Sequence, residues 1–195
     1  MSDDRIRLKS WLSCTRCVLH RTRRRVVLGR GVIPAEIMFI GEAPGRSEDL
    51  IGEAFVGRAG RILNAAMADA TETVGRSPTF YISNTVGCIP CDRKGGDLRE
   101  PQSGEWLACW PRLQLTYRLV DPEEVIFLGS LARVACGDRF QGAHHLLHPA
   151  YILRRGGTSS MEYRTFVREL ADIFAKKPPS RLGSKDVFGD AIRRG

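Results

Sequence analysis

The chain has 195 residues, of which 43% are hydrophobic and 27% are charged, as in an ordinary globular domain. It contains no run of about 18 apolar residues, and its N-terminal segment lacks the apolar core of a signal peptide, so we expect neither a membrane span nor secretion. The formal net charge of +8 favours a polyanionic partner. We therefore expect a cytoplasmic monomer.

Positive charge is concentrated at the two ends of the chain. Residues 1–30 contain nine Lys or Arg and two Asp, and residues 176–195 contain six Lys or Arg and two Asp. The densest run, "RTRRR" at 21–25, suits a nucleic-acid backbone because each neutralised phosphate releases counterions, although a solvated basic face is the alternative. We predict one domain over 1–175 and a basic C-terminal tail over 176–195.

Buried strands alternate with helices along the chain. Short apolar runs bounded by turn residues predict the strands, and apolar residues at helical spacing predict the helices. This alternation indicates an α/β fold, in which ligands bind at the carboxyl ends of the strands. The expected strands are 36–41, 79–84 and 124–129, and the expected helices are 62–70, 103–120, 130–136 and 160–177, the last stopped by Pro178 and Pro179.

An acidic turn follows the first strand, in the sequence "GEAPGRSED" at 41–49. It lacks the Lys-Ser/Thr of a phosphate loop and the glycine spacing of dinucleotide binders, and its carboxylates would repel phosphate. Glu42 and Glu48 therefore indicate acid/base chemistry or hydrogen bonding on a neutral group. Capping of the next helix is the alternative for Glu42 and for Asp49.

Two further segments carry polar side chains that suit a nucleic-acid base. Asn84 ends the second strand and presents a donor and an acceptor together, although a turn-forming Asn is common there. His148 precedes Pro149 and an apolar group that two arginines follow. Alone, it would be a structural histidine, but the combination suits a wedge entering a duplex while arginines hold phosphates. The wedge and arginines comprise Tyr151, Ile152, Leu153, Arg154 and Arg155.

The cysteines indicate metal chemistry. Cys14 and Cys17 form one C-x2-C pair, Cys88 and Cys91 form another, and Cys109 lies on a predicted helix. The 70 residues between the pairs exclude a local zinc ribbon, whereas four thiolates from distant segments suit zinc or an iron–sulfur cluster. Buried free thiols are the alternative. Cys136, in an alanine-rich segment, is expected to be part of the core.

Taken in order, these motifs resemble family 4 of the uracil-DNA glycosylase superfamily, the iron–sulfur uracil-DNA glycosylases. The resemblance covers about residues 11–174 and is most specific in "GEAPGRSEDLIGEAFVGRAGRIL". It implies a three-layer α/β/α sandwich with a central, mostly parallel, four-stranded sheet. It also implies that the enzyme flips a non-canonical pyrimidine, by default uracil, out of DNA and hydrolyses its N-glycosidic bond. The abasic site that remains would pass to downstream processing enzymes.

The resemblance also implies roles for individual residues. The domain over 1–175 would be the glycosylase domain, with a [4Fe-4S] cluster on Cys14, Cys17, Cys88 and Cys109. Phe55 would stack on the flipped base, Asn84 would read its edge, and His148 would donate to the pyrimidine O2. Glu42 and Glu48 would belong to the catalytic and water-positioning group. Ala43 lines the base pocket where other uracil glycosylases have a water-activating Asp, and Tyr151, Leu153, Arg154 and Arg155 would contact DNA.

Two departures from the family keep alternatives open. Twenty residues separate Cys88 from Cys109, more than is common in the family, and this insertion contains the extra Cys91 as a competing ligand. The hairpin that usually precedes the His-Pro motif is also largely missing. An altered rim allows excision of a bulky C5-modified cytosine, such as glucosylated hydroxymethylcytosine in phage DNA, as an antiphage defence. A non-catalytic, DNA-binding iron–sulfur protein is the second alternative.

Overall fold

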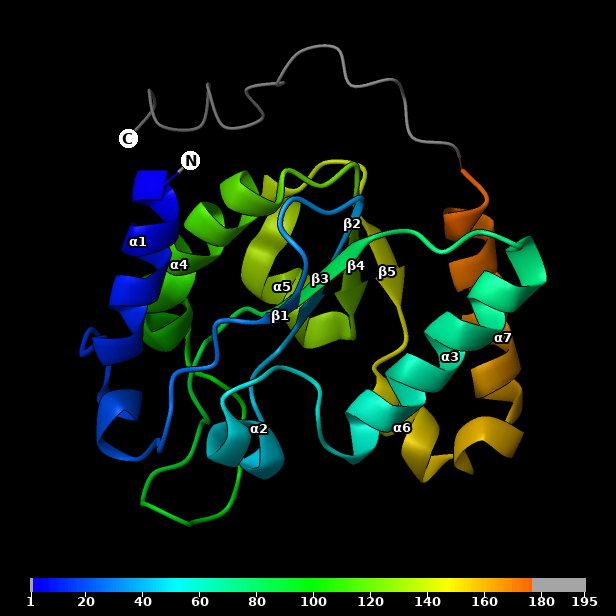
Figure 1. Cartoon of the computed structure of the whole chain (residues 1–195). Coiled ribbons are helices and arrows are strands. Elements are labelled where there is room, and N and C mark those ends of the chain that lie inside the picture. Colours follow the sequence, from blue (N-terminus) through cyan, green and yellow to red (C-terminus); the bar gives the residue numbers. More distant parts are fainter. Residues whose placement is uncertain (1, 177–195) are drawn as a thin grey trace.

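The computed structural model describes residues 2–176, and the predicted tail beyond residue 176 lies outside them. A five-stranded sheet has the order β1-β3-β2-β4-β5, and all neighbours are parallel except β1 and β3 (Figure 1). The three expected strands are confirmed, and two short ones are added. The strands are β1 Arg30–Gly31, β2 Ile37–Gly41, β3 Phe80–Asn84, β4 Glu124–Leu128 and β5 His144–Leu146.

The sheet therefore has one strand more than the four predicted. The edge strand β1 contains only two residues, and it pairs Arg30 with Ile82 and Gly31 with Tyr81. Gly31 has a φ of +122°, and a Cβ there would lie 2.2 Å from the Phe80 carbonyl oxygen. Such a strand forms through backbone pairing alone, so it has no hydrophobic pattern to reveal it.

The helices follow the predicted pattern with shifted ends. Helix α3 begins at Arg58, one turn before the expected start, because Gly57 provides the extended N-cap. Helix α7 ends at Phe174, and the prolines expected to stop it lie outside the described residues. The helices are α1 Ser2–Ser10, α2 Arg46–Ile51, α3 Arg58–Val74, α4 Ser103–Val120, α5 Ser130–Cys136, α6 Pro149–Arg154 and α7 Met161–Phe174.

Two apolar clusters lie on opposite faces of the sheet, because alternate residues of each strand point to opposite sides. Ile37 and Phe39 pack with α3, α6 and α7, whereas Met38 and Ile40 pack with α4 and α5. Figure 1 shows α3 and α7 on one side of the sheet and α1 and α4 on the other. The predicted three-layer α/β/α sandwich is confirmed.

The carboxyl ends of the parallel strands meet at one edge of the sheet, as the sequence predicts. The acidic turn follows β2 there, Asn84 ends β3, and His148 lies two residues after β5. Among the described residues, no helix combines the length and apolar character needed to cross a membrane.

Candidate functional site

An open cleft of about 640 Å³ lies at this edge of the sheet. Its walls come from the acidic turn, the start of α3, the end of β3, the insertion before α4 and the start of α6. Six of the predicted site residues therefore share one cleft, although they come from three distant segments. They are Glu42, Ala43, Glu48, Phe55, Asn84 and His148.

Asn84 presents an unsatisfied oxygen in this cleft. Only 2% of the residue is exposed, and its Oδ1 is buried without a hydrogen-bond partner among the described residues. Leaving a buried acceptor unpaired costs about 1–3 kcal/mol, so such a group in a cleft is a ready partner for a ligand. Gly41 makes room for it, because a Cβ there would lie 2.6 Å from Asn84 Oδ1.

Phe55 holds its ring beside Asn84 with an unusual backbone. Its φ is +54°, which is uncommon for a bulky residue. Arg30 donates to the carbonyls of Ala54 (2.6 Å) and Phe55 (3.4 Å), which fixes this turn. The ring lies 6.0 Å from the His148 ring, centroid to centroid. A flat aromatic surface therefore forms one wall of the cleft, next to the open Asn84 oxygen.

His148 is held in one neutral tautomer. It is the N-cap of α6, and its Nδ1 accepts a hydrogen bond of 3.0 Å from the backbone N–H of Ala150. Since Nδ1 accepts, the ring proton is on Nε2. Burial, and to a lesser degree the charge of Arg154, lowers the pKa of His148 to about 4. His148 is therefore a neutral donor at physiological pH.

Glu42 lines the cleft from the acidic turn after β2. Its backbone carbonyl accepts from Thr85 Oγ1 (2.6 Å) and from Val86 N–H (3.2 Å), which ties the turn to β3. No hydrogen bond to its carboxylate forms within residues 2–176. Burial raises the pKa of Glu42, and the nearby Glu100 raises it further. Glu42 does not cap α2, because Gly45 occupies that position.

Glu48 is fully engaged, unlike Glu42. Its Oε2 accepts from Gly45 N–H at 3.1 Å and its Oε1 accepts from Gly57 N–H at 2.8 Å. One carboxylate therefore ties the start of α2 to the start of α3. The catalytic role of Glu48 stays a prediction, and both of its carboxylate oxygens hold the backbone that shapes the cleft.

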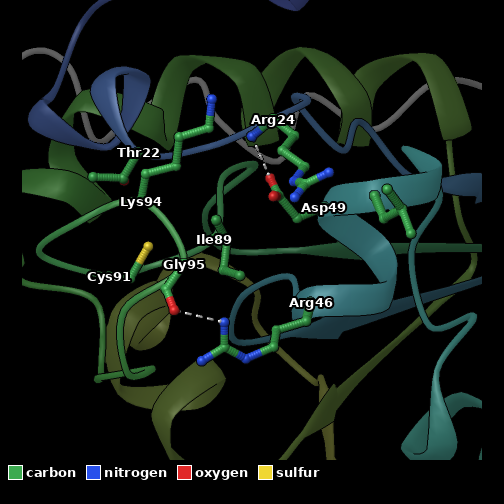
Figure 2. Close-up of a pocket in the computed structure, with 9 residues that line it drawn as sticks. Thr22, Arg24, Arg46, Asp49, Ile89, Cys91, Lys94 and Gly95 are labelled. Carbon is green, nitrogen blue, oxygen red and sulfur yellow. Dashed lines mark hydrogen bonds between the residues drawn. The ribbon is translucent and has the colours of Figure 1, made fainter.

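Asp49 has a role that its position in the sequence does not reveal. It is 6% exposed, and its Oδ1 accepts from the backbone N–H groups of Arg24 (2.8 Å) and Arg25 (3.3 Å). The hydrogen bond to Arg24 appears in Figure 2. Asp49 thus anchors the arginine-rich run. The helix-capping role offered by the sequence does not account for these bonds, because they join residues about 25 positions apart.

The predicted DNA-entering segment is the helix α6, and its side chains differ in exposure. Tyr151 is 40% exposed, whereas Leu153 packs against the core between α3 and α7. Arg154 is exposed, and Arg155 donates to Glu162 at 2.9 Å. Of the predicted wedge and arginines, Tyr151 and Arg154 are therefore the side chains free to meet a partner.

The four predicted ligand cysteines lie near one another, where the N-terminal segment meets the turn after β3 and α4. The thiols of Cys14 and Cys109 contribute to raising the pKa of Cys17, which burial raises most. The pKa of Cys88 is raised to about 12, mainly by burial, with contributions from Cys109 and Cys17. Cys91 instead lines a separate pocket, so Cys88 is the better placed of the two competing ligands. Cys136 is fully buried in the core, as predicted.

Arg112, which no sequence motif singles out, connects Cys109 to Asn84. Its side chain is fully buried, and its Nε donates to Cys109 Sγ at 3.2 Å. Its other nitrogens donate to Ser83 Oγ (3.1 Å) and to the carbonyls of Asn84 and Thr85. The available signal was its spacing, three residues after Cys109 on one face of a helix.

Comparisons with known proteins agree with this geometry. The family profile of the Uracil DNA glycosylase superfamily matches residues 28–171. The chain is 31% identical to the Type-4 uracil-DNA glycosylase of Archaeoglobus fulgidus over 193 residues, which cover 87% of this chain and 92% of that protein. It is 37% identical to the Type-4 enzyme of Thermotoga maritima over 61% of this chain and 58% of that protein. It is 40% identical to the Type-4 enzyme of Saccharolobus solfataricus over 60% of this chain and 50% of that protein.

Proposed function

Because the chain belongs to the uracil-DNA glycosylase superfamily, in its type-4 branch, we propose that it removes uracil from DNA by hydrolysing the N-glycosidic bond. The observation that carries this proposal is the unpaired Asn84 Oδ1 beside an aromatic wall and a neutral histidine donor. These three groups offer what a flipped pyrimidine requires: a stacking surface, an amide to read its edge, and a proton donor.

On the base side, the enzyme must stabilise negative charge. When the bond between C1′ and the base nitrogen breaks, its electron pair remains on the base and charge develops on O2. The Nε2–H of His148 would donate to O2, and the neutral ring does this without losing a proton. Phe55 would stack on the base, and the Asn84 amide would pair with its edge.

On the sugar side, the enzyme must stabilise positive charge and supply a nucleophile. Glu42 fits this role because its carboxylate has no donor within the described residues and its pKa is raised, as in a general base. It would accept a proton from the water whose oxygen bonds to C1′. Ala43 supplies no acid, and Glu48 would act as a positioning residue that holds Gly45 and Gly57.

The cysteine region fits an anionic iron–sulfur group. Within residues 2–176, no three His, Cys, Asp or Glu side chains converge on a single metal ion, whereas a four-iron cluster binds each thiolate to a different iron. Arg112 is a buried cation with no carboxylate partner in this part of the chain, and it donates to Cys109 Sγ. An anionic cluster on Cys14, Cys17, Cys88 and Cys109 would balance that charge. Its role would be structural, since Arg112 also holds the carbonyl of Asn84.

The DNA duplex would lie across the cleft, with Tyr151 and Arg154 of α6 facing it. Tyr151 would occupy the space that the flipped nucleotide leaves, and Arg154 would hold a phosphate. The product would be an abasic site, which other enzymes must process.

The activity is tested with duplexes that contain one uracil, followed by alkaline cleavage at abasic sites. We expect strand breaks with the wild type and at least a 100-fold slower reaction with Asn84→Ala. Gln141→Ala, which changes an exposed amide outside the cleft, is the matched control. Cleavage of a glucosylated hydroxymethylcytosine duplex but not of the uracil duplex would contradict the proposal.

The cluster is tested by the visible absorbance and iron content of protein purified without oxygen. Cys17→Ala should lose both, whereas Cys91→Ala should keep both because Cys91 lies in a different pocket. Protein that contains zinc in place of iron, or that loses iron with Cys91→Ala, would overturn the assignment.

A further inference from the structure

A second hollow lies next to the base cleft. Its volume is about 370 Å³, and it is bounded by the arginine-rich run, α2 and the insertion between β3 and α4 (Figure 2). Arg46 lines both hollows, so they are neighbours on one surface. The proposed catalytic groups line only the base cleft, and none of them lines the second hollow.

Positive charge dominates the second hollow. Its cations are Arg24, Arg46 and Lys94, and its one carboxylate is Asp49. Figure 2 shows Arg24 and Lys94 along the upper side of the view and Arg46 along the lower side. Asp49 already accepts two backbone N–H groups, which satisfy part of its charge.

The three cations are not neutralised by a carboxylate in the described part of the chain. Within residues 2–176, no carboxylate forms an ion pair with Arg24, Arg46 or Lys94. The guanidinium of Arg46 donates to two neutral carbonyls, those of Gly95 (3.2 Å) and Gly96 (2.8 Å). Arg24 and Lys94 are exposed. The hollow therefore has a positive charge that the protein itself does not neutralise, and its position is fixed by the bonds to Asp49 and to the insertion.

We propose that this hollow binds a backbone phosphate of the DNA strand that flanks the flipped nucleotide. Arg24 and Lys94 would contact the phosphate oxygens, and Arg46 would hold the insertion in place as part of the wall. This proposal rests on the proposed function for the presence of DNA in the neighbouring cleft. It also gives the insertion between β3 and α4, which carries Lys94, a role in DNA contact.

The test is the salt dependence of DNA binding. Binding constants are measured by fluorescence anisotropy for a duplex with a tetrahydrofuran abasic-site analogue, from about 50 to 200 mM salt. The double variant Arg24→Ala/Lys94→Ala should bind more weakly, and its slope of log K against log salt should fall by about 0.9, the value for one phosphate. Arg168→Ala/Arg164→Ala, two exposed arginines on α7, is the matched control and should leave the slope unchanged. A control slope that falls equally would overturn the assignment.

A neutral methylphosphonate placed in turn at each phosphate of the duplex locates the contact. One flanking position should weaken binding of the wild type and have no further effect on the double variant. Full additivity at every position would overturn the proposal, because the two side chains would then contact no single phosphate. Inorganic phosphate is the second probe. If it binds the wild type and not the double variant while both bind DNA with the same slope, the hollow is a free-phosphate site, and the proposal is wrong.

The two proposals fail in different ways. If the wild type cleaves the uracil duplex but the double variant keeps its slope, the phosphate site is wrong and the proposed function stands. If the wild type releases no base but the slope and the methylphosphonate position respond as expected, the proposed function is wrong and the phosphate site stands.

Discussion

The base cleft and the cysteine region are joined through Arg112, which donates to both Cys109 Sγ and the Asn84 carbonyl, but their polar groups are satisfied to different degrees. In the cleft, the Asn84 oxygen is buried without a partner and the Glu42 carboxylate has no donor within the described residues. In the cysteine region, the fully buried Arg112 makes hydrogen bonds to Cys109, Ser83 and the carbonyls that follow β3. A site that must bind a ligand keeps polar groups without hydrogen-bond partners, whereas the polar groups of the supporting region are hydrogen-bonded within the protein.

Loss of Arg112 should produce the largest effect on stability. Arg112→Met keeps much of the side-chain volume but leaves the carbonyls of Asn84 and Thr85 without their donor. We expect the free energy of unfolding to fall by several kcal/mol, because each buried acceptor left unpaired costs about 1–3 kcal/mol. Denaturant unfolding and iron content measure this change.

Arg118→Met is the control for that variant, since Arg118 is exposed on the same helix. Arg112→Lys separates charge from geometry, because lysine keeps the charge and loses the planar fork. If Arg112→Met is as stable and as rich in iron as the control, the supporting role of the cysteine region is wrong.

A substitution that crowds Asn84 and Phe55 in the base cleft should have the next largest effect. In Gly41→Ala, the new Cβ would lie 2.6 Å from both Asn84 Oδ1 and Phe55 Cζ, so one of them must move. We expect a loss of about 1–3 kcal/mol of stability from overpacking and a decrease in kcat/KM of about 100-fold from the misplaced groups. Gly104→Ala, where nothing lies within 4 Å of the new Cβ, should lower neither the stability nor kcat/KM. Unchanged base release in Gly41→Ala would show that the cleft is not the reaction site.

Much of the fold could be predicted because its signals are local. The runs that form β2, β3 and β4 each contain three or four consecutive apolar residues and are bounded by turns, and the ends of parallel strands share one edge. These signals alone predict that the acidic turn and Asn84 lie close together. The edge strand β1 carries no such pattern, and only its backbone pairing defines it.

The working roles within the site could not be predicted because they depend on long-range hydrogen bonds. Glu42 and Glu48 look equivalent in the sequence, yet only Glu48 binds the backbone of two helix starts. The buried position of Arg112 likewise depends on how α4 packs against the turn after β3. The ligand cysteines proposed from the family resemblance remain predictions, supported here by their proximity.

The lowered pKa of His148 in the base cleft also predicts that the stability of the protein depends on pH. The pKa of His148 is about 4 in the folded protein and about 6.5 in the unfolded chain. Between these values the unfolded chain binds the extra proton, so the free energy of unfolding should fall as the pH falls from 6.5 to 4. Urea unfolding across this range should show the fall in the wild type and a smaller one in His148→Gln. His145→Gln, an exposed histidine, should follow the wild type, and an equal fall in all three proteins would assign the effect to other groups.

The smallest expected effect concerns Glu100, which reaches the cleft from the insertion. Its charge helps to raise the pKa of Glu42, although burial is the larger cause. Other charged groups also line this cleft, namely Arg46, Glu48, Arg58 and Arg99. Glu100→Gln removes one negative charge, so Glu42 should ionise at a lower pH and the acid limb of kcat/KM should move to lower pH. Asp97→Asn removes the same charge from the exposed part of the insertion and should leave the limb in place. If Glu100→Gln leaves the limb where it was, Glu42 is not the group whose ionisation limits the reaction, and the open carboxylate is not the base.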